Sequence, residues 1–195
     1  MLPVFADPFS NSLVSVLSTG VLALLTAMIF RILIQMQGTG TEKMKVIADQ
    51  VRAGAMAFLK REYKVIGIFV VLIAACIFVF LDTGLANAQS GNWGTPFTSG
   101  SFVLGAFCSV LAGYIGMRAA TAANIRTTQA ARTSLGNALR IAFLSGATMG
   151  LSVVGLGILG LVGGLLYLVH TAGLSLGDAL QSLTGFSFGA STVAL

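Results

Sequence analysis

The sequence predicts an all-α membrane protein, a polytopic bundle of transmembrane helices, and three observations carry this prediction. Of its 195 residues, 56% are hydrophobic and only 9% are charged, which is too apolar for a soluble domain. Glycine contributes 24 residues, a high number for a soluble helical bundle. The apolar stretches run unbroken for about 17 to 29 residues, and a helix needs about 20 to cross a bilayer.

Hydropathy predicts four complete spans and the start of a fifth. The four lie at residues 12–34, 65–81, 101–117 and 141–170, and the fifth begins near residue 179. The second is short, and the fourth is long enough to tilt strongly or to project beyond the bilayer. The last apolar run reaches Leu195 without a flanking charge or aromatic anchor. We therefore expect residues 1–195 to be the N-terminal portion of one longer multi-span membrane domain.

The basic residues orient these spans. All 11 lysines and arginines fall in two windows, residues 31–64 and 118–140. By the positive-inside rule both windows are cytoplasmic, and the N-terminus is outside. The net charge of +5 is then a signal of topology. A nucleic-acid partner is the weaker interpretation, because these charges flank membrane spans without a soluble binding module.

The first basic window contains its own helical pattern. Thr39 and Glu42 have the spacing of a capping box. Apolar residues then recur at intervals of three and four, which predicts an amphipathic helix at about 41–63; these are Met44, Ile47, Val51, Ala55 and Phe58. We expect this helix to lie at the membrane interface or against neighbouring helices. Binding or coupling to a partner is the alternative.

Small residues follow the third span at intervals of four. One series is Ser101, Gly105, Ser109 and Gly113, and a second is Ala112, Gly116 and Ala120. Such seams let the backbones of neighbouring membrane helices approach closely. We therefore expect the third helix to pack against other helices along much of its length.

The third helix should also continue into the cytoplasm. The stretch "GYIGMRAATAANIRTTQAAR", residues 113–132, contains no proline or turn signal. Arg118 fits a snorkelling position at the headgroups, and Arg126 lies about 12 Å further along the axis. We expect Arg126 to be solvated or to pack against another cytoplasmic element. Contact with phosphate is the alternative, because guanidinium forks suit it.

The chain shows no sign of a catalytic centre, a cofactor site or a metal site. The cytoplasmic windows contain three acidic residues, Glu42, Asp49 and Glu62, which are too dispersed to bind Mg²⁺ together. The spans hold almost no ionisable residues, which would be the usual marks of an ion path. The few that occur lie near the ends of the spans, namely Arg31, Asp82, His170 and Asp178. The place of His170 beside an outer boundary favours an interfacial position, with proton relay as the alternative. We therefore predict no catalytic, cofactor-binding or metal-binding residue.

Four segments resemble, in order, the N-terminal part of a known family. They are "RAGAMAFLKREYKVI", "AGYIGMRAATAANIRTTQAAR", "ALRIAFLSGATMGLSVVGLG" and "TGFSFGASTVAL". The family is that of the membrane-bound, ion-translocating inorganic pyrophosphatases. The resemblance implies a homodimeric pump in a lipid bilayer, most simply a prokaryotic plasma membrane. Such a pump couples pyrophosphate hydrolysis to the export of protons or sodium, with Mg²⁺ and in some members K⁺ as cofactors.

The resemblance also implies a division of labour. The first four helices belong to an outer ring, and the fifth begins an inner ring around the ion path. Its hydroxyls, Ser187, Ser191 and Thr192, would line that path or form hydrogen bonds between helices. The carboxylates that bind Mg²⁺ and the substrate loop follow Leu195 in the family. This segment is therefore expected to be mainly scaffold and inactive by itself.

A non-enzymatic function is the alternative. Composition also permits one half or one subunit of a secondary transporter, or a scaffold for membrane assembly. An acidic cytoplasmic loop soon after Leu195 would favour the pump, and further purely apolar spans would favour the transporter. We prefer the pump because four separate matches occur in order.

Overall fold

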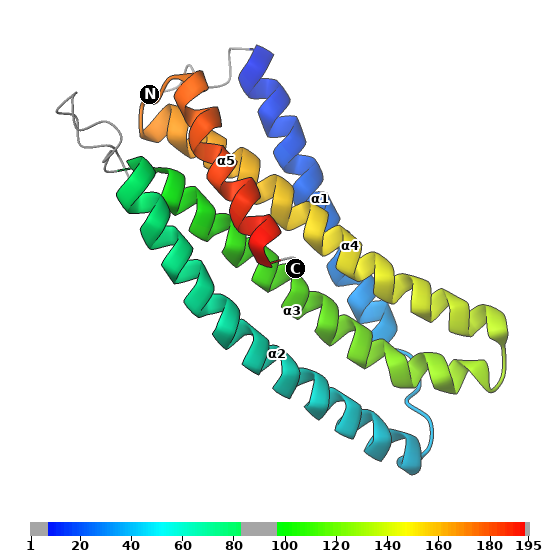
Figure 1. Cartoon of the computed structure of the whole chain (residues 1–195). Coiled ribbons are helices and arrows are strands. Elements are labelled where there is room, and N and C mark those ends of the chain that lie inside the picture. The colour runs from blue at the N-terminus through cyan, green and yellow to red at the C-terminus, as the bar shows by residue number, and fades with distance from the viewer. Residues whose placement is uncertain (1–7, 83–96, 194–195) are drawn as a thin grey trace. The chain divides into compact units, whose positions relative to one another are not determined.

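The structure is a computed structural model that describes residues 8–82 and 97–193. Five long helices make up most of this part of the chain (Figure 1); they are α1 (Pro8–Gln35), α2 (Glu42–Ile77), α3 (Phe97–Ala131), α4 (Leu135–Leu166) and α5 (Leu176–Val193). Two π-helical turns, η1 (Phe78–Asp82) and η2 (Tyr167–Thr171), follow α2 and α4. No strand occurs in the described residues, so the all-α prediction is confirmed.

Four helices have the length and composition needed to cross a membrane. They occupy Asn11–Gln35, Glu42–Asp82, Phe97–Ala131 and Leu135–Thr171, and each contains one of the four complete spans predicted from hydropathy. The helix α5 corresponds to the fifth apolar segment. The continuation predicted for the third helix beyond its span is also confirmed, because α3 runs to Ala131 without a break.

The amphipathic helix predicted at about 41–63 is not separate from the second span. The structure joins residues 42–63 to the second span in one helix, α2, which continues to Ile77. The sequence around Lys60 and Glu62 explains this difference, because lysine, arginine and glutamate are good helix formers and no proline interrupts residues 42–77. Residues 42–63 therefore extend the second span and do not form a separate interfacial helix.

The helices contribute to two compact units. Unit 1 consists of residues 1–20, 64–110 and 156–195, and unit 2 consists of residues 21–63 and 111–155. The core of unit 1 forms where the end of α4 and η2 pack against α5, and its buried side chains are Leu165, Leu168, Ala179, Leu183 and Phe186. Burial of these apolar side chains fixes α5 against its neighbours within unit 1.

The backbones of α3 and α5 approach each other closely in unit 1. A Cβ atom added at Gly189 would overlap the carbonyl oxygen of Phe102, and one added at Gly105 would overlap that of Phe186. Phe102 is fully buried beside this crossing, and its ring centroid lies 5.4 Å from that of Phe188. The close packing predicted from the small residues of the third span is thus confirmed at Gly105.

Other glycines of the same helix meet only side chains. In unit 2, a Cβ atom at Gly113 would lie 3.0 Å from the hydroxyl of Tyr63, and one at Gly116 would lie 2.7 Å from Cγ of Met149. A flexible side chain can move away from an added methyl group, whereas an opposing helix backbone cannot do so without separating the helices. The glycine series therefore makes backbone contact at Gly105 and only side-chain contact at Gly113 and Gly116.

A buried carboxylate connects the end of η1 with the start of α3. Asp82 is 4% exposed, and its Oδ2 accepts a hydrogen bond from the backbone N–H of Ser99 at 2.9 Å. The first N–H groups of a helix have no partner within the helix, and a negative charge is favourable there. Asp82 thus caps α3 from a position 17 residues earlier in the chain.

Removing this cap should lower the stability of the protein. We expect Asp82→Ala to reduce the free energy of unfolding by about 1 kcal/mol, the usual value for a lost helix cap. Asp82→Asn keeps an acceptor oxygen and should cost less. Thermal denaturation in detergent measures both, with Asp49→Asn, an exposed carboxylate within α2, as control. A wild-type melting temperature for Asp82→Ala would show that the carboxylate does not support the helix.

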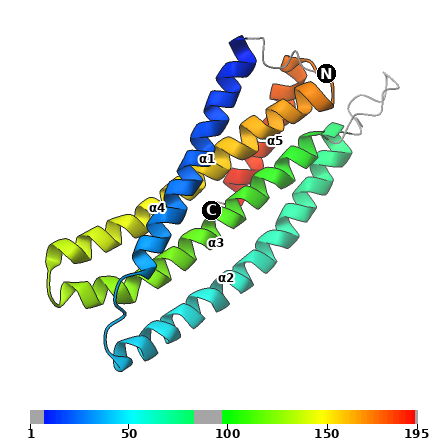
Figure 2. The same ribbon diagram turned by 180° about the vertical axis from the view of Figure 1, so that it is seen from behind.

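Unit 2 brings together parts of four helices. Its core contains Ile34 of α1, Ala123 of α3 and Ile141 of α4, all nearly inaccessible to solvent. Two short connections lie in this unit, one between α1 and α2 and one between α3 and α4 (Figure 2). The turn before α2 includes Gly40 with a φ of 75°, a conformation that favours glycine. The turn before α4 includes Ser134, whose hydroxyl accepts the N–H of Asn137 at 3.4 Å.

Candidate functional site

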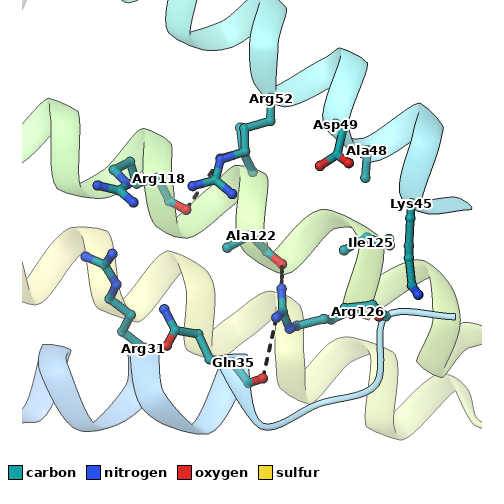
Figure 3. Close-up of a pocket in the computed structure, with 12 residues that line it drawn as sticks. Arg31, Gln35, Lys45, Ala48, Asp49, Arg52, Arg118, Ala122, Ile125 and Arg126 are labelled. Atoms are coloured by element: carbon teal, nitrogen blue, oxygen red, sulfur yellow. Dashed lines mark hydrogen bonds between the residues drawn. The ribbon is translucent and has the colours of Figure 1, made fainter.

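A pocket of about 520 Å³ lies in unit 2, between α1, α2 and α3 (Figure 3). Its lining is unusually basic. It contains five cationic side chains and one carboxylate, namely Arg31, Lys45, Arg52, Arg118, Arg126 and Asp49. Of the two basic windows recognised in the sequence, the first supplies three of these cations and the second supplies two. The structure therefore gathers at one place charges that lie far apart along the chain.

Helical periodicity explains how each helix presents its charges to the pocket. Lys45 and Arg52 are seven residues apart on α2, and Arg118 and Arg126 are eight apart on α3. Two turns of helix span about seven residues, so each pair lies on one face. Between them, Ala48 on α2 and Ala122 on α3 also line the pocket, and their small side chains leave its centre open.

Arg126 joins two helices at the edge of this pocket. Its Nη1 donates to the carbonyl oxygen of Ala122, one turn earlier, at 2.6 Å, and its Nη2 donates to the carbonyl oxygen of Gln35 at 3.4 Å. Gln35 is the last residue of α1, where carbonyl groups lack partners within the helix. Arg126 thus packs against another element, as expected, and stabilises the end of α1.

Arg118 is held by an aromatic ring of its own helix. Its guanidinium carbon lies 5.7 Å from the ring centroid of Tyr114, and Nη1 donates to the Tyr114 hydroxyl at 3.2 Å. This distance is within the range of a cation–π interaction. The contact restricts the side chain of Arg118 without neutralising its charge. In Figure 3 the guanidinium groups of Arg31 and Arg118 reach from α1 and α3 toward the same end of the pocket.

The pocket carries an excess of positive charge. Five cationic groups and one carboxylate give a formal charge of +4. Lys45 has an ion pair with Glu42 at 3.2 Å, but the two side chains are 47% and 82% exposed, so water screens the pair. Within the described residues, no ion pair joins Asp49 to any of the five cations. The geometry therefore suits an anion.

The described residues offer little for other chemistry. They contain no group of three or more His, Cys, Asp or Glu side chains placed to bind one metal ion. His170 is exposed in η2. On α5, the Thr192 hydroxyl donates to the carbonyl oxygen of Phe188 in its own helix at 2.8 Å, while Ser187 and Ser191 are exposed. The proposed lining of an ion path by these hydroxyls stays a prediction.

Comparison with known proteins identifies the family. The family model described as inorganic H+ pyrophosphatase matches residues 21–195. A K(+)-insensitive pyrophosphate-energized proton pump from Methanosarcina mazei is 38% identical over 176 residues, which cover 90% of this chain and 23% of the relative. The corresponding pump from Caldanaerobacter subterraneus is 42% identical over 169 residues, covering 82% and 23%.

A third relative has a different ion in its name. The K(+)-stimulated pyrophosphate-energized sodium pump from Thermotoga maritima is 39% identical over 151 residues, covering 75% of this chain and 18% of the relative. The chain thus spans about a quarter or less of the length of these relatives. The match extends through all five helices apart from the start of α1, and the resemblance noted in the sequence is confirmed. The chain forms part of an integral membrane protein and belongs to the inorganic H+ pyrophosphatase family.

Proposed function

We propose that the full-length protein couples the hydrolysis of inorganic pyrophosphate to the transport of protons, or of sodium ions, out of the cytoplasm. The observation that carries this proposal is the family match over residues 21–195, supported by relatives named as pyrophosphate-energized pumps. The four helices with the properties of membrane spans agree with such a pump. Both ions remain in the proposal because the relatives include a proton pump and a sodium pump.

The part of the pump described by this chain acts mainly as scaffold. Its helices meet through glycine contacts, through the Asp82 cap and through Arg126. The described residues do not fit a Mg²⁺ site, because no group of three or more suitable ligands is placed to hold one ion. We therefore derive no step through Mg²⁺ from these residues. Binding of Mg²⁺, and of K⁺ where it is required, is assigned to other parts of the full-length protein.

The proposal includes an assembly and a location. The full-length protein is a homodimer in a prokaryotic plasma membrane, with pyrophosphate supplied from the cytoplasm. The distribution of basic residues supports a cytoplasmic position for residues 31–64 and 118–140. The pocket of unit 2, which draws its cations from both windows, then opens on the side of the membrane where pyrophosphate is supplied.

Coupled transport is the direct test of this function. The full-length protein, reconstituted in sealed vesicles, should hydrolyse pyrophosphate with Mg²⁺ and build a gradient of H⁺ or Na⁺ that a matching ionophore dissipates. Residues 1–195 alone should do neither. Ion movement without hydrolysis would favour the secondary transporter, and hydrolysis that never produces a gradient would exclude a pump.

Cysteine labelling tests the topology. In a variant without Cys76 and Cys108, a single cysteine at Gly38 or Thr128 should react with a membrane-impermeant maleimide only from the cytoplasmic side. A cysteine at Ser90, which lies outside the described residues, should react only from the opposite side. Labelling at Thr128 from outside would invert the proposed orientation.

A further inference from the structure

The basic pocket of unit 2 contains more positive charge than the described residues neutralise. Its formal charge of +4 arises from five cations and one carboxylate. Like charges gathered around one concave surface repel each other, and the low-dielectric body of the protein strengthens this repulsion. Some of these cations are nevertheless held in place, because Arg118 is fixed by Tyr114 and Arg126 by two carbonyl oxygens. An anion in the pocket would relieve the repulsion.

One buried donor at the edge of the pocket has no acceptor in the part of the chain that the structure describes. The Nε of Arg126 is inaccessible to water and has no hydrogen-bond acceptor among the described residues. An N–H group buried in this way is costly, and most such groups in proteins have a partner. The same burial leaves no room for a phosphate oxygen beside Nε, and the other two nitrogens of Arg126 already donate to carbonyl oxygens. Arg126 therefore borders the pocket, and an anion would be bound by the neighbouring guanidinium groups.

The chemistry of the lining selects among anions. Four guanidinium groups and one ammonium group surround the pocket, and guanidinium forks match the oxygens of phosphate in a bidentate manner. Gln35 and Thr39 add polar side chains to the lining. A volume of about 520 Å³ accommodates a group larger than a single chloride ion. The small side chains of Ala48 and Ala122 keep this volume free.

We infer that this pocket binds a phosphate-bearing anion, held by Arg31, Arg52 and Arg118 in the space beside Arg126. The shared chemistry is a phosphate group with at least one negative charge. It is carried either by the headgroup of an acidic phospholipid or by free inorganic phosphate. The bound phosphate ties α1, α2 and α3 together within unit 2. This binding does not depend on whether the protein hydrolyses pyrophosphate, so the two proposals can fail separately.

Two binding measurements on the purified full-length protein distinguish the sources. Native mass spectrometry measures retention of phosphatidylglycerol against phosphatidylcholine, and isothermal calorimetry measures binding of inorganic phosphate. We expect one of these probes to lose affinity by about tenfold or more in Arg31→Gln and Arg118→Gln, the fold-change expected for a lost charge-assisted hydrogen bond. Loss for phosphatidylglycerol alone identifies a headgroup site, and loss for phosphate alone identifies a soluble anion.

A variant that is expected to bind the anion more tightly separates an effect on binding from an effect on folding. Asp49→Asn removes the one carboxylate of the pocket and should tighten binding of the same probe severalfold, a gain that a misfolded protein would not show. Lys60→Gln and Arg140→Gln remove basic residues outside the pocket and should leave binding unchanged. The inference is overturned if neither probe responds to the pocket variants, or if Lys60→Gln and Arg140→Gln weaken binding as much as Arg31→Gln.

Discussion

Replacing Gly189 by alanine should strongly destabilise the protein, by about 3 kcal/mol or more, at the upper end of the usual cost of overpacking. The added methyl group would overlap the carbonyl oxygen of Phe102 and would also lie 3.0 Å from the backbone nitrogen of Ala106. Both are backbone atoms of α3, so the two helices must separate to make room. Gly105→Ala should have a similar effect, because its methyl group would overlap the carbonyl oxygen of Phe186 on α5.

The chain offers matched controls for this experiment. A Cβ atom at Gly157 or Gly163 of α4 would have no described heavy atom within 4 Å apart from the adjoining backbone of its own helix, and alanine favours a helix over glycine by about 1 kcal/mol. Gly157→Ala and Gly163→Ala should therefore be neutral or stabilising. Gly116→Ala should be intermediate, because the side chain of Met149 can move. Thermal denaturation in detergent compares the variants, and a wild-type melting temperature for Gly189→Ala would disprove the close approach of α3 and α5.

Truncation of Arg126 should have the second largest effect. Arg126→Ala removes the donors to the carbonyl oxygens of Ala122 and Gln35. Hydrogen bonds that involve a charged group contribute about 1.5–3 kcal/mol each. The longer bond to Gln35, at 3.4 Å, should contribute less than the bond to Ala122. We therefore expect a loss of about 2–3 kcal/mol in the free energy of unfolding.

Two further variants serve as controls for Arg126→Ala. Arg132 directly follows α3, is exposed and donates from Nη1 to Oε1 of Gln129 at 3.4 Å, so Arg132→Ala should change stability by less than about 0.5 kcal/mol. Arg126→Lys keeps the charge but cannot reach two carbonyl oxygens with a planar fork, and it should recover only part of the loss. Equal melting temperatures for Arg126→Ala and Arg132→Ala would contradict the bracing role.

The features that were predicted from the sequence depend on local patterns. The spans follow from runs of apolar residues, and the extension of α3 follows from the alanines and the absence of proline between residues 113 and 132. The seam that includes Gly105 follows from its four-residue spacing. Only the crossing geometry, however, determines that Gly105 meets a helix backbone whereas Gly116 meets the side chain of Met149.

Other features depend on contacts between distant residues and were not predicted. Asp82 and Ser99 are 17 residues apart, and Arg126 and Gln35 are 91 apart, so no local pattern marks either pair. The positive-inside rule predicted that both basic windows lie on one side of the membrane, but only the fold brings Arg31, Arg52 and Arg118 around one pocket. The continuity of α2 was missed for a different reason. The change from amphipathic to fully apolar residues near Tyr63 suggested a boundary that good helix formers do not create.

The central claim is that these residues support the structure of a pyrophosphate-driven pump and do not hold its substrate. Its most direct test is hydrolysis and ion uptake by full-length Arg126→Ala in sealed vesicles, measured over a range of pyrophosphate concentrations. We predict a KM within about twofold of wild type, with a reduced turnover rate or less ion transported per pyrophosphate, because structure and not substrate binding is disturbed. A KM raised many-fold with an intact turnover rate would contradict the claim, since Arg126 would then contribute to binding the substrate.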